Sequence, residues 1–159
     1  MYLKSLLAFL ILGVSSVFAA SNEVEKDFIV KESPDVVSKW LLANPDKIVE
    51  STGSKLISRK DGLVRVRKQT SKGDYEFTIR ETTKTTATTT LYVTKLVEVH
   101  EGDIVSHTNK ITLTPTNKGT KVVIYMFVDV KNKRVTPLDI HVTLSKSANG
   151  FERMLKSKF

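Results

Sequence analysis

The feature of this sequence that most constrains its fold is a series of β-prone segments between residues 54 and 130. Short turn signals separate them. Asp61-Gly62 supplies the positive φ that a tight hairpin turn requires, and three later turns each contain a glycine. Strands joined by such short turns pair with their neighbours, which predicts an antiparallel meander. The predicted strands span residues 56–60, 63–69, 75–83, 88–100, 104–114 and 120–130.

Alternation along these strands predicts which face of the sheet is buried, because successive side chains in a strand point to opposite faces. Two polar residues, His107 and Asn109, fall on the predicted inner face, whereas Tyr125 and Phe127 make the outer face of the last strand apolar as well. Lys95 interrupts the pattern, so we expect a β-bulge between residues 85 and 99. The residues assigned to the inner face are Tyr75, Phe77, Ile79, Val105, His107, Asn109, Ile111, Leu113, Val122, Ile124, Met126 and Val128.

Helical signals flank the predicted sheet on both sides. Before it, residues 27–31 predict a first strand, and a Ser-Pro-Asp sequence at 33–35 is typical of a helix start. A second short helix is expected over 46–51. After the sheet, Thr136-Pro137 begins a long helix whose apolar stripe contains Gly150. Since glycine costs about 1 kcal/mol of helix propensity relative to alanine, we expect close helix–sheet packing there to compensate.

This order of elements resembles the helix-grip fold of the START-like superfamily, also called the polyketide cyclase-like or SRPBCC group. The similarity is carried by residues 28–30, by 33–37 with Trp40, and by 147–156, and it covers residues 24–158. The resemblance implies an α+β domain in which one strand, two helices, six further strands and a helix form a curved antiparallel sheet wrapped around the C-terminal helix. It also implies a cavity between sheet and helix for an apolar small molecule or lipid, with no universal catalytic motif.

Facial alternation and this resemblance together predict a ligand-binding surface. The polar side chains of His107 and Asn109 would orient a ligand hydroxyl or carbonyl, or else be solvated at an open rim. The small residues Ala148 and Gly150 leave room for a cavity, although a collapsed core stays an alternative. The predicted ligand-binding residues are Phe77, Ile79, His107, Asn109, Ile111, Ile124, Met126, Leu144, Ala148 and Phe151.

Catalytic and metal-binding motifs are sparse. The chain has no cysteine, no Gly-x-Ser-x-Gly motif and no phosphate-binding glycine loop. Glu76, Arg80 and Glu81 are acid–base candidates, but Glu76 and Arg80 fall on the face predicted to be solvated. His107 with His141 and Asp139 is the other combination to consider. We predict binding without catalysis, a cofactor or a metal. A cyclase, dehydratase or hydrolase that uses His107 in the same cavity is the second hypothesis.

The net charge of +8 bears on the choice of partner. Basic residues cluster at 59–68 and 131–134, and besides aiding solubility they suit an anionic envelope surface. No aromatic residues are interleaved with them to stack on bases, which argues against nucleic acid. A third hypothesis is a cell-envelope interaction module that forms a homodimer through Tyr125 and Phe127. The predicted partner of the favoured hypothesis is a hydrophobic small molecule or lipid.

Residues 1–19 have the pattern of a secretory signal peptide. Lys4 precedes an unbroken apolar run, and a cut after Ala19 places Val17 and Ala19 at the two positions that require small side chains. A retained membrane anchor is the alternative, but the uncharged stretch from Ser5 to Ala20 has 16 residues, whereas a spanning helix needs about 20. We therefore predict export to a periplasm or the cell exterior, with residues 20–159 forming a single helix-grip domain.

Overall fold

The computed structural model describes residues 22–159. The predicted signal peptide lies outside the described residues. In chain order the elements are β1 (Glu23–Val30), α1 (Pro34–Ala43), α2 (Pro45–Ser51), β2 (Lys55–Lys60), β3 (Leu63–Thr70), β4 (Gly73–Thr85), β5 (Thr90–Glu101), β6 (Ile104–Thr116), β7 (Gly119–Val130) and α3 (Pro137–Lys158). This order confirms the predicted α+β fold class, and β1 begins four residues earlier than the sequence pattern predicts.

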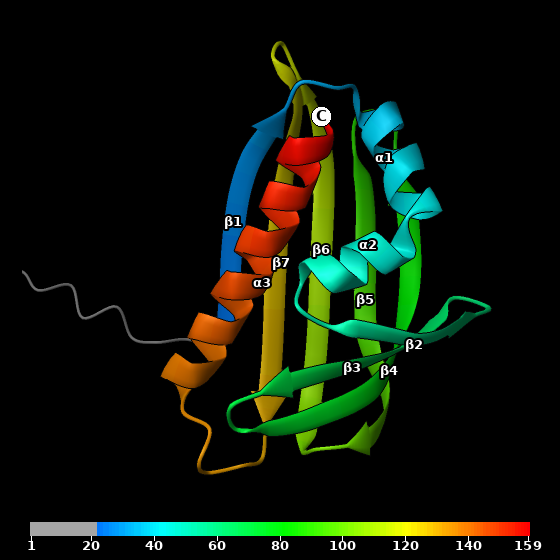
Figure 1. Ribbon diagram of the computed structural model, residues 1–159. Helices are drawn as coiled ribbons and strands as arrows, with labels where there is room; N and C mark the ends of the chain where they lie inside the picture. The colour runs from blue at the N-terminus through cyan, green and yellow to red at the C-terminus, as the bar shows by residue number, and fades with distance from the viewer. Residues whose placement is uncertain (1–21) are drawn as a thin grey trace, which may run out of the picture.

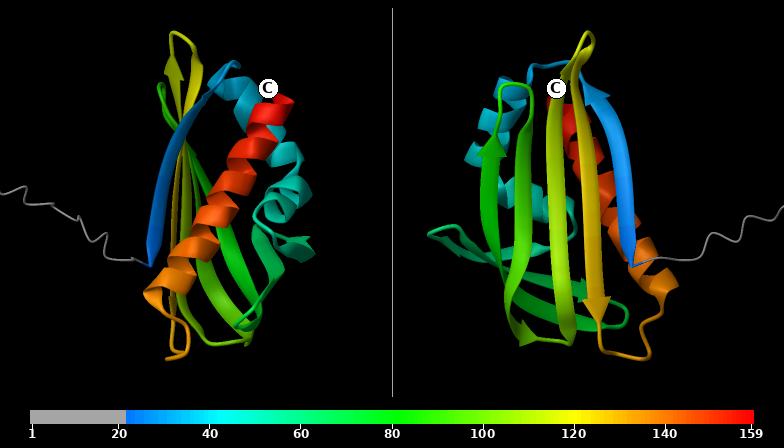
Figure 2. Two further views of the ribbon diagram at one scale, coloured as in Figure 1. Left: turned by 60° about the vertical axis from the view of Figure 1, so that its left-hand side comes forward. Right: turned by 180° about the vertical axis from the view of Figure 1, so that it is seen from behind.

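All seven strands form one antiparallel sheet in the order β1-β7-β6-β5-β4-β3-β2. The sheet is strongly curved: β2 and β3 run at a steep angle to β6 and β7, and α3 lies diagonally across the concave face (Figure 1). Figure 2 shows all three helices on one side of the sheet, while the opposite face of β5, β6, β7 and β1 carries no helix. We call these the inner and outer faces.

Local sequence explains the turns and bulges that shape this sheet. Asp61 and Gly62 both have positive φ, at 52° and 72°, as the β2–β3 hairpin requires. The expected bulge in β5 is present, with Val97 as the extra residue between two paired positions. A second bulge at Val105 in β6 contradicts one assignment: Val105 is 46% exposed, and Ile104 takes the inner position instead. Each bulge adds local twist and so bends the sheet.

Buried side chains form two clusters on the inner face. The larger one joins β1, β6 and β7 to α1 and to α3, where it runs from Ile140 to Leu155. The smaller one lies under β3 and β4 and includes Val66, Phe77 and Ile79. Helix α3 therefore contacts the larger cluster along most of its length.

Gly150 of α3 does not pack against the sheet, which corrects the expectation from sequence. A Cβ atom at this position would lie 1.9 Å from the backbone oxygen of Ser51, at the end of α2. The helix–helix contact therefore requires glycine. It also means that Gly150 provides no space for a ligand, because the α2 backbone occupies it.

The start of α3 is fixed by a capping box. The Thr136 hydroxyl accepts a hydrogen bond from the Asp139 backbone N–H at 3.2 Å, and the Asp139 carboxylate accepts one from the Thr136 N–H at 2.9 Å. This reciprocal pair satisfies two backbone donors that the helix itself leaves free. It holds the first turn of α3, which forms one edge of the site described next, in a defined position.

Candidate functional site

A cavity of about 330 Å³ lies between the inner face of the sheet and the first half of α3. Its walls come from β3, β4, β6, β7, α3 and the segment after α2, so it is bounded by both core clusters. Apolar atoms provide the larger share of the wall surface, although 12 of the 23 lining residues are polar or charged. The residues that line it are Thr52, Ser54, Lys68, Thr70, Ser71, Lys72, Tyr75, Phe77, Ile104, His107, Asn109, Met126, Val128, Val130, Val135, Leu138, Asp139, Ile140, Val142, Thr143, Leu144, Lys146 and Ser147.

Half of the residues predicted to bind ligand line this cavity, namely Phe77, His107, Asn109, Met126 and Leu144. The other half do not. Ile79 packs in the smaller core cluster, and the remaining four belong to or pack against the larger one. Those four are Ile111, Ile124, Ala148 and Phe151. Ligand contact by any of the ten stays a prediction.

The position of the cavity along α3 explains this division. The predicted space near Ala148 and Gly150 is filled, since Ala148 is 1% exposed and α2 contacts Gly150. Helix α1 fills the neighbouring space, where Ser38 bonds the Tyr92 hydroxyl at 2.5 Å. The open volume lies instead beside the earlier turns of α3, from Leu138 to Ser147. Facial alternation identifies the buried face but not the part of that face left unfilled.

Lys68 on β3 is a cavity residue that the sequence prediction missed. Its Nζ donates hydrogen bonds to the Thr52 backbone oxygen at 2.6 Å and to the Ser147 hydroxyl at 3.1 Å. Burial lowers the pKa of Lys68 below its ordinary value. Alternation could have located it, because Val64 and Val66 point inward and Lys68 is the next residue in that series. The sequence prediction grouped it with the surface arginines of the same strand.

His107 is buried in the cavity wall. Its ring centroid lies 5.1 Å from that of Phe77, and its Nδ1 atom has no hydrogen-bond partner among the described residues. Burial, reinforced by the charge of Lys68, lowers the pKa of His107 to about 4. At neutral pH the ring is therefore uncharged, and its buried Nδ1 atom is left without a hydrogen bond.

The mouth of the cavity lies between α3 and the β3–β4 hairpin. On the helix side, Leu138 and Val142 line the cavity and are 59% and 43% exposed, so a strip of apolar surface leads inward. Across the mouth, the Lys72 ammonium lies 3.7 Å from the Asp139 carboxylate. Asp139 also belongs to the capping box, so this ion pair links the hairpin to the fixed end of α3.

The combination of His107, His141 and Asp139 is not a site. His141 lines a different, open hollow beside β1, together with Ala148 and Asn149. Among residues 22–159 no group of three or more histidine, aspartate, glutamate or cysteine side chains could hold a metal ion. His141 is therefore not part of the main cavity.

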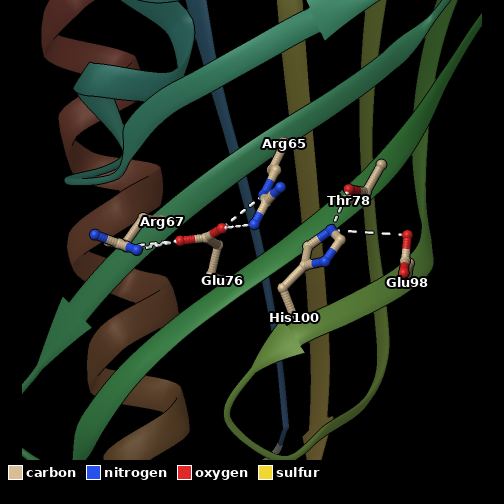
Figure 3. A network of polar contacts seen from close by, with 6 residues as sticks. All are labelled: Arg65, Arg67, Glu76, Thr78, Glu98 and His100. Carbon is tan, nitrogen blue, oxygen red and sulfur yellow. Dashed lines mark hydrogen bonds and ion pairs between the residues drawn. The ribbon is translucent and has the colours of Figure 1, made fainter.

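Glu76 lies on the outer face as predicted, but it is not solvated. Its side chain is 5% exposed because Arg65 and Arg67 of β3 lie on either side of it (Figure 3). Their Nε atoms donate hydrogen bonds to the two carboxylate oxygens at 2.6 and 2.8 Å. Burial alone would raise the pKa of Glu76, but the bonds and charges of the two arginines hold it below its ordinary value.

Two further candidates, Glu81 and Tyr125, also have partners. Glu81 accepts a hydrogen bond from Arg59 at 2.8 Å, and the Tyr125 hydroxyl donates one to Glu23 at 2.7 Å. Figure 3 shows His100 directed toward Thr78 and Glu98 from the end of β5. These contacts are structural, so the acid–base candidates Glu76 and Glu81 serve as ion-pair partners on the sheet surface.

No helix within residues 22–159 has the length and apolar character to cross a bilayer.

Comparisons of the chain with protein-family models and with curated proteins find no match. Its fold, in contrast, is similar to many solved structures, three of which are described here.

The first is a START superfamily protein from Mycobacterium smegmatis, with 11% sequence identity, a TM-score of 0.63, and coverage of 86% of this chain and 95% of that one. The second is a STAR-related lipid transfer protein from Xanthomonas axonopodis, with 15% identity, a TM-score of 0.66, and coverage of 87% and 86%. The third is the Zhui aromatase/cyclase from Streptomyces sp. R1128, with 11% identity, a TM-score of 0.62, and coverage of 86% and 92%. The chain therefore has the START-like, helix-grip fold that its sequence resembles.

Proposed function

We propose that this protein is exported and binds one hydrophobic or amphipathic small molecule or lipid in the cavity beneath α3, without changing it chemically. The observation that carries the proposal is a cavity of about 330 Å³ whose wall surface is mainly apolar, with polar and charged side chains at its margins and within it. Small-molecule sites in proteins typically have this composition and a volume of about 300–1,000 Å³. The similarity of the fold to those of a lipid transfer protein and an aromatase/cyclase supports a lipid or small-molecule ligand.

The walls suggest how affinity and orientation would arise. Phe77, Met126 and Leu144 offer apolar surface, and burying apolar ligand area contributes about 25 cal/mol per Å². His107 and Asn109 would supply the polar contacts that fix orientation. The apolar strip at Leu138 and Val142 provides a route by which an oily molecule enters.

The test is uptake of the neutral fluorescent probe N-phenyl-1-naphthylamine by the purified protein. Val128→Phe places a bulkier side chain in the cavity wall, whereas Val123→Phe adds the same bulk to the other face of the same strand. We expect the wild type and Val123→Phe to take up the probe and Val128→Phe to lose most of the signal. Absence of uptake by the wild type, or equal uptake by both variants, would contradict the proposal.

Export is tested separately by the mass of the chain recovered from a bacterial periplasm. Cleavage after Ala19 gives a protein that begins at Ala20. Leu10→Arg interrupts the apolar run of the predicted signal peptide and should leave the full-length chain in the cytoplasm. Recovery of the uncleaved wild-type chain in the cytoplasm would show that residues 1–19 do not direct export.

A further inference from the structure

The cavity wall contains a lysine, Lys68, and the binding of a purely apolar ligand does not explain its positive charge there. The lysines that line the cavity are Lys68, Lys72 and Lys146. Lys72 pairs with Asp139 at the mouth, and Lys146 is exposed. Lys68 is half-buried and has no carboxylate within ion-pair distance among residues 22–159.

The hydrogen bonds of Lys68 leave it incompletely satisfied. An ammonium group has three N–H donors, and the Thr52 oxygen and the Ser147 hydroxyl accept two of them. Both acceptors are uncharged, so the positive charge is not neutralised. A cation removed from water in this way is costly unless it is paired. The apolar residues Val64 and Val66 precede it on the same face of β3, so a hydrophobic residue would fit the pattern better if the site bound only oily molecules.

We propose that the ligand is an amphipathic monocarboxylic acid whose carboxylate accepts a hydrogen bond from the Lys68 ammonium group inside the cavity. This inference rests on the proposed function, and it adds the chemical class of the ligand. Its apolar chain or ring lies against Phe77, Met126 and Leu144, on the other parts of the wall. Asn109 and the uncharged ring of His107 line the same cavity and can bond the second carboxylate oxygen.

The charge of the site favours a carboxylate over a phosphate. Lys68 offers one positive charge and one remaining donor, which match a single negative charge. A phosphate monoester carries about −1.5 to −2 charges and three acceptor oxygens at pH 7, and it is usually bound by several cations. Lys72 cannot supply the second charge without leaving Asp139 unpaired.

The experiment measures displacement of N-phenyl-1-naphthylamine by ligands with one ten-carbon chain and different head groups: decanoate, decanol and decyl phosphate. A hydrogen bond to a charged group contributes about 1.5–3 kcal/mol, which corresponds to about a tenfold to hundredfold change in Kd. We therefore expect decanoate to bind the wild type at least about tenfold more tightly than decanol, with decyl phosphate weaker than decanoate.

Three variants locate the source of this preference. Lys68→Met keeps the length of the side chain and removes its charge, so it should reduce the affinity for decanoate to that for decanol. Lys68→Arg restores a cation and should recover part of the preference. Lys95→Met removes the same charge from the outer face of β5 and should keep the wild-type preference. Circular dichroism checks that each variant is folded.

The outcomes separate this inference from the proposed function. If the probe and all three ligands fail to bind, both are wrong. If the probe binds but decanoate and decanol compete equally, the cavity binds small molecules and Lys68 is not an anion site. A preference for decanoate that survives Lys68→Met, or that Lys95→Met removes to the same extent, would also overturn it. Tighter binding of decyl phosphate than of decanoate would contradict the inferred ligand class and indicate a phosphate ester in place of a carboxylic acid.

Discussion

The clearest test of the buried cavity wall is the effect of pH on stability through His107. The structure lowers the pKa of this residue from 6.5 to about 4, because burial disfavours the charged ring and Lys68 adds to the effect. In the unfolded chain the ring takes up a proton near pH 6.5, whereas in the folded protein it stays neutral down to about pH 4. Between these two values the unfolded state binds more protons, so the free energy of unfolding falls as the pH falls.

The size of the effect follows from the shift. One pKa unit corresponds to 1.36 kcal/mol, so a lowering from 6.5 to about 4 predicts a loss of about 3 kcal/mol between pH 7 and pH 4. Carboxylates such as Glu76 and Asp139 have lowered pKa values in the folded protein, so their protonation in acidic solution also lowers the free energy of unfolding. A comparison with a variant that lacks only the His107 ring cancels their contribution.

The assay is urea unfolding of the wild type and of His107→Gln at several pH values from 7.5 to 4. Glutamine keeps a polar group in the cavity wall but does not titrate, so the difference in free energy of unfolding between the two proteins should change by about 3 kcal/mol across this range. A difference between wild type and His107→Gln that stays constant from pH 7.5 to pH 4 would refute burial of a neutral ring.

Three further predictions concern single contacts. Gly150→Ala should lower the free energy of unfolding by about 1–3 kcal/mol, because the added Cβ overlaps the Ser51 carbonyl. This loss is expected although alanine has a better helix propensity than glycine, and urea unfolding measures it. Glu76→Gln should lower the thermal midpoint at pH 7, and the deficit should shrink as acid protonates the wild-type carboxylate below its ordinary pKa of 4.5. Lys72→Ala removes the ion pair with Asp139 and should speed release of N-phenyl-1-naphthylamine up to about fivefold, measured by stopped-flow fluorescence.

Matched variants check each of these contacts. Arg153→Ala, at an exposed position of the same helix, should be close to neutral in stability. Glu98→Gln removes a carboxylate that is 65% exposed and should change the thermal midpoint much less than Glu76→Gln does. Lys84→Ala removes a cation far from the mouth, at the opposite end of β4, and should leave probe release unchanged. Equal effects in any variant and its control would contradict the corresponding contact.

Element order and the buried faces of most strands were predictable from sequence because they depend on local signals. Turn residues such as Asp61-Gly62 fix where strands end, and the alternation through Phe77 and Ile79 follows from the geometry of a strand. A bulge breaks that geometry by one residue. For this reason Val105 was assigned to the wrong face, although His107 and Asn109 after it were placed correctly.

The cavity itself was less predictable, because unfilled space depends on several elements that are distant in sequence. Ala148 appeared to leave room, but the backbone of α2 and the side chains of the larger core cluster occupy that region. Similarly, the cover over Glu76 comes from arginines on the neighbouring strand, which only the register of β3 and β4 reveals. Lys68 is different, because the alternation of side chains along β3 alone predicts that it points to the inner face of the sheet.

Pairing between β1 and β7 has a consequence for biosynthesis. The strand that is made first among the described elements occupies a sheet edge, and its hydrogen-bonding neighbour is the last strand to be made. A chain that emerges from the ribosome therefore displays Phe28 and Val30 with no backbone partner until residues 119–130 have followed. Nascent chains that stop short of Gly119 should consequently be recognised by chaperones, whereas chains released after Lys158 can close the sheet and place α3 upon it.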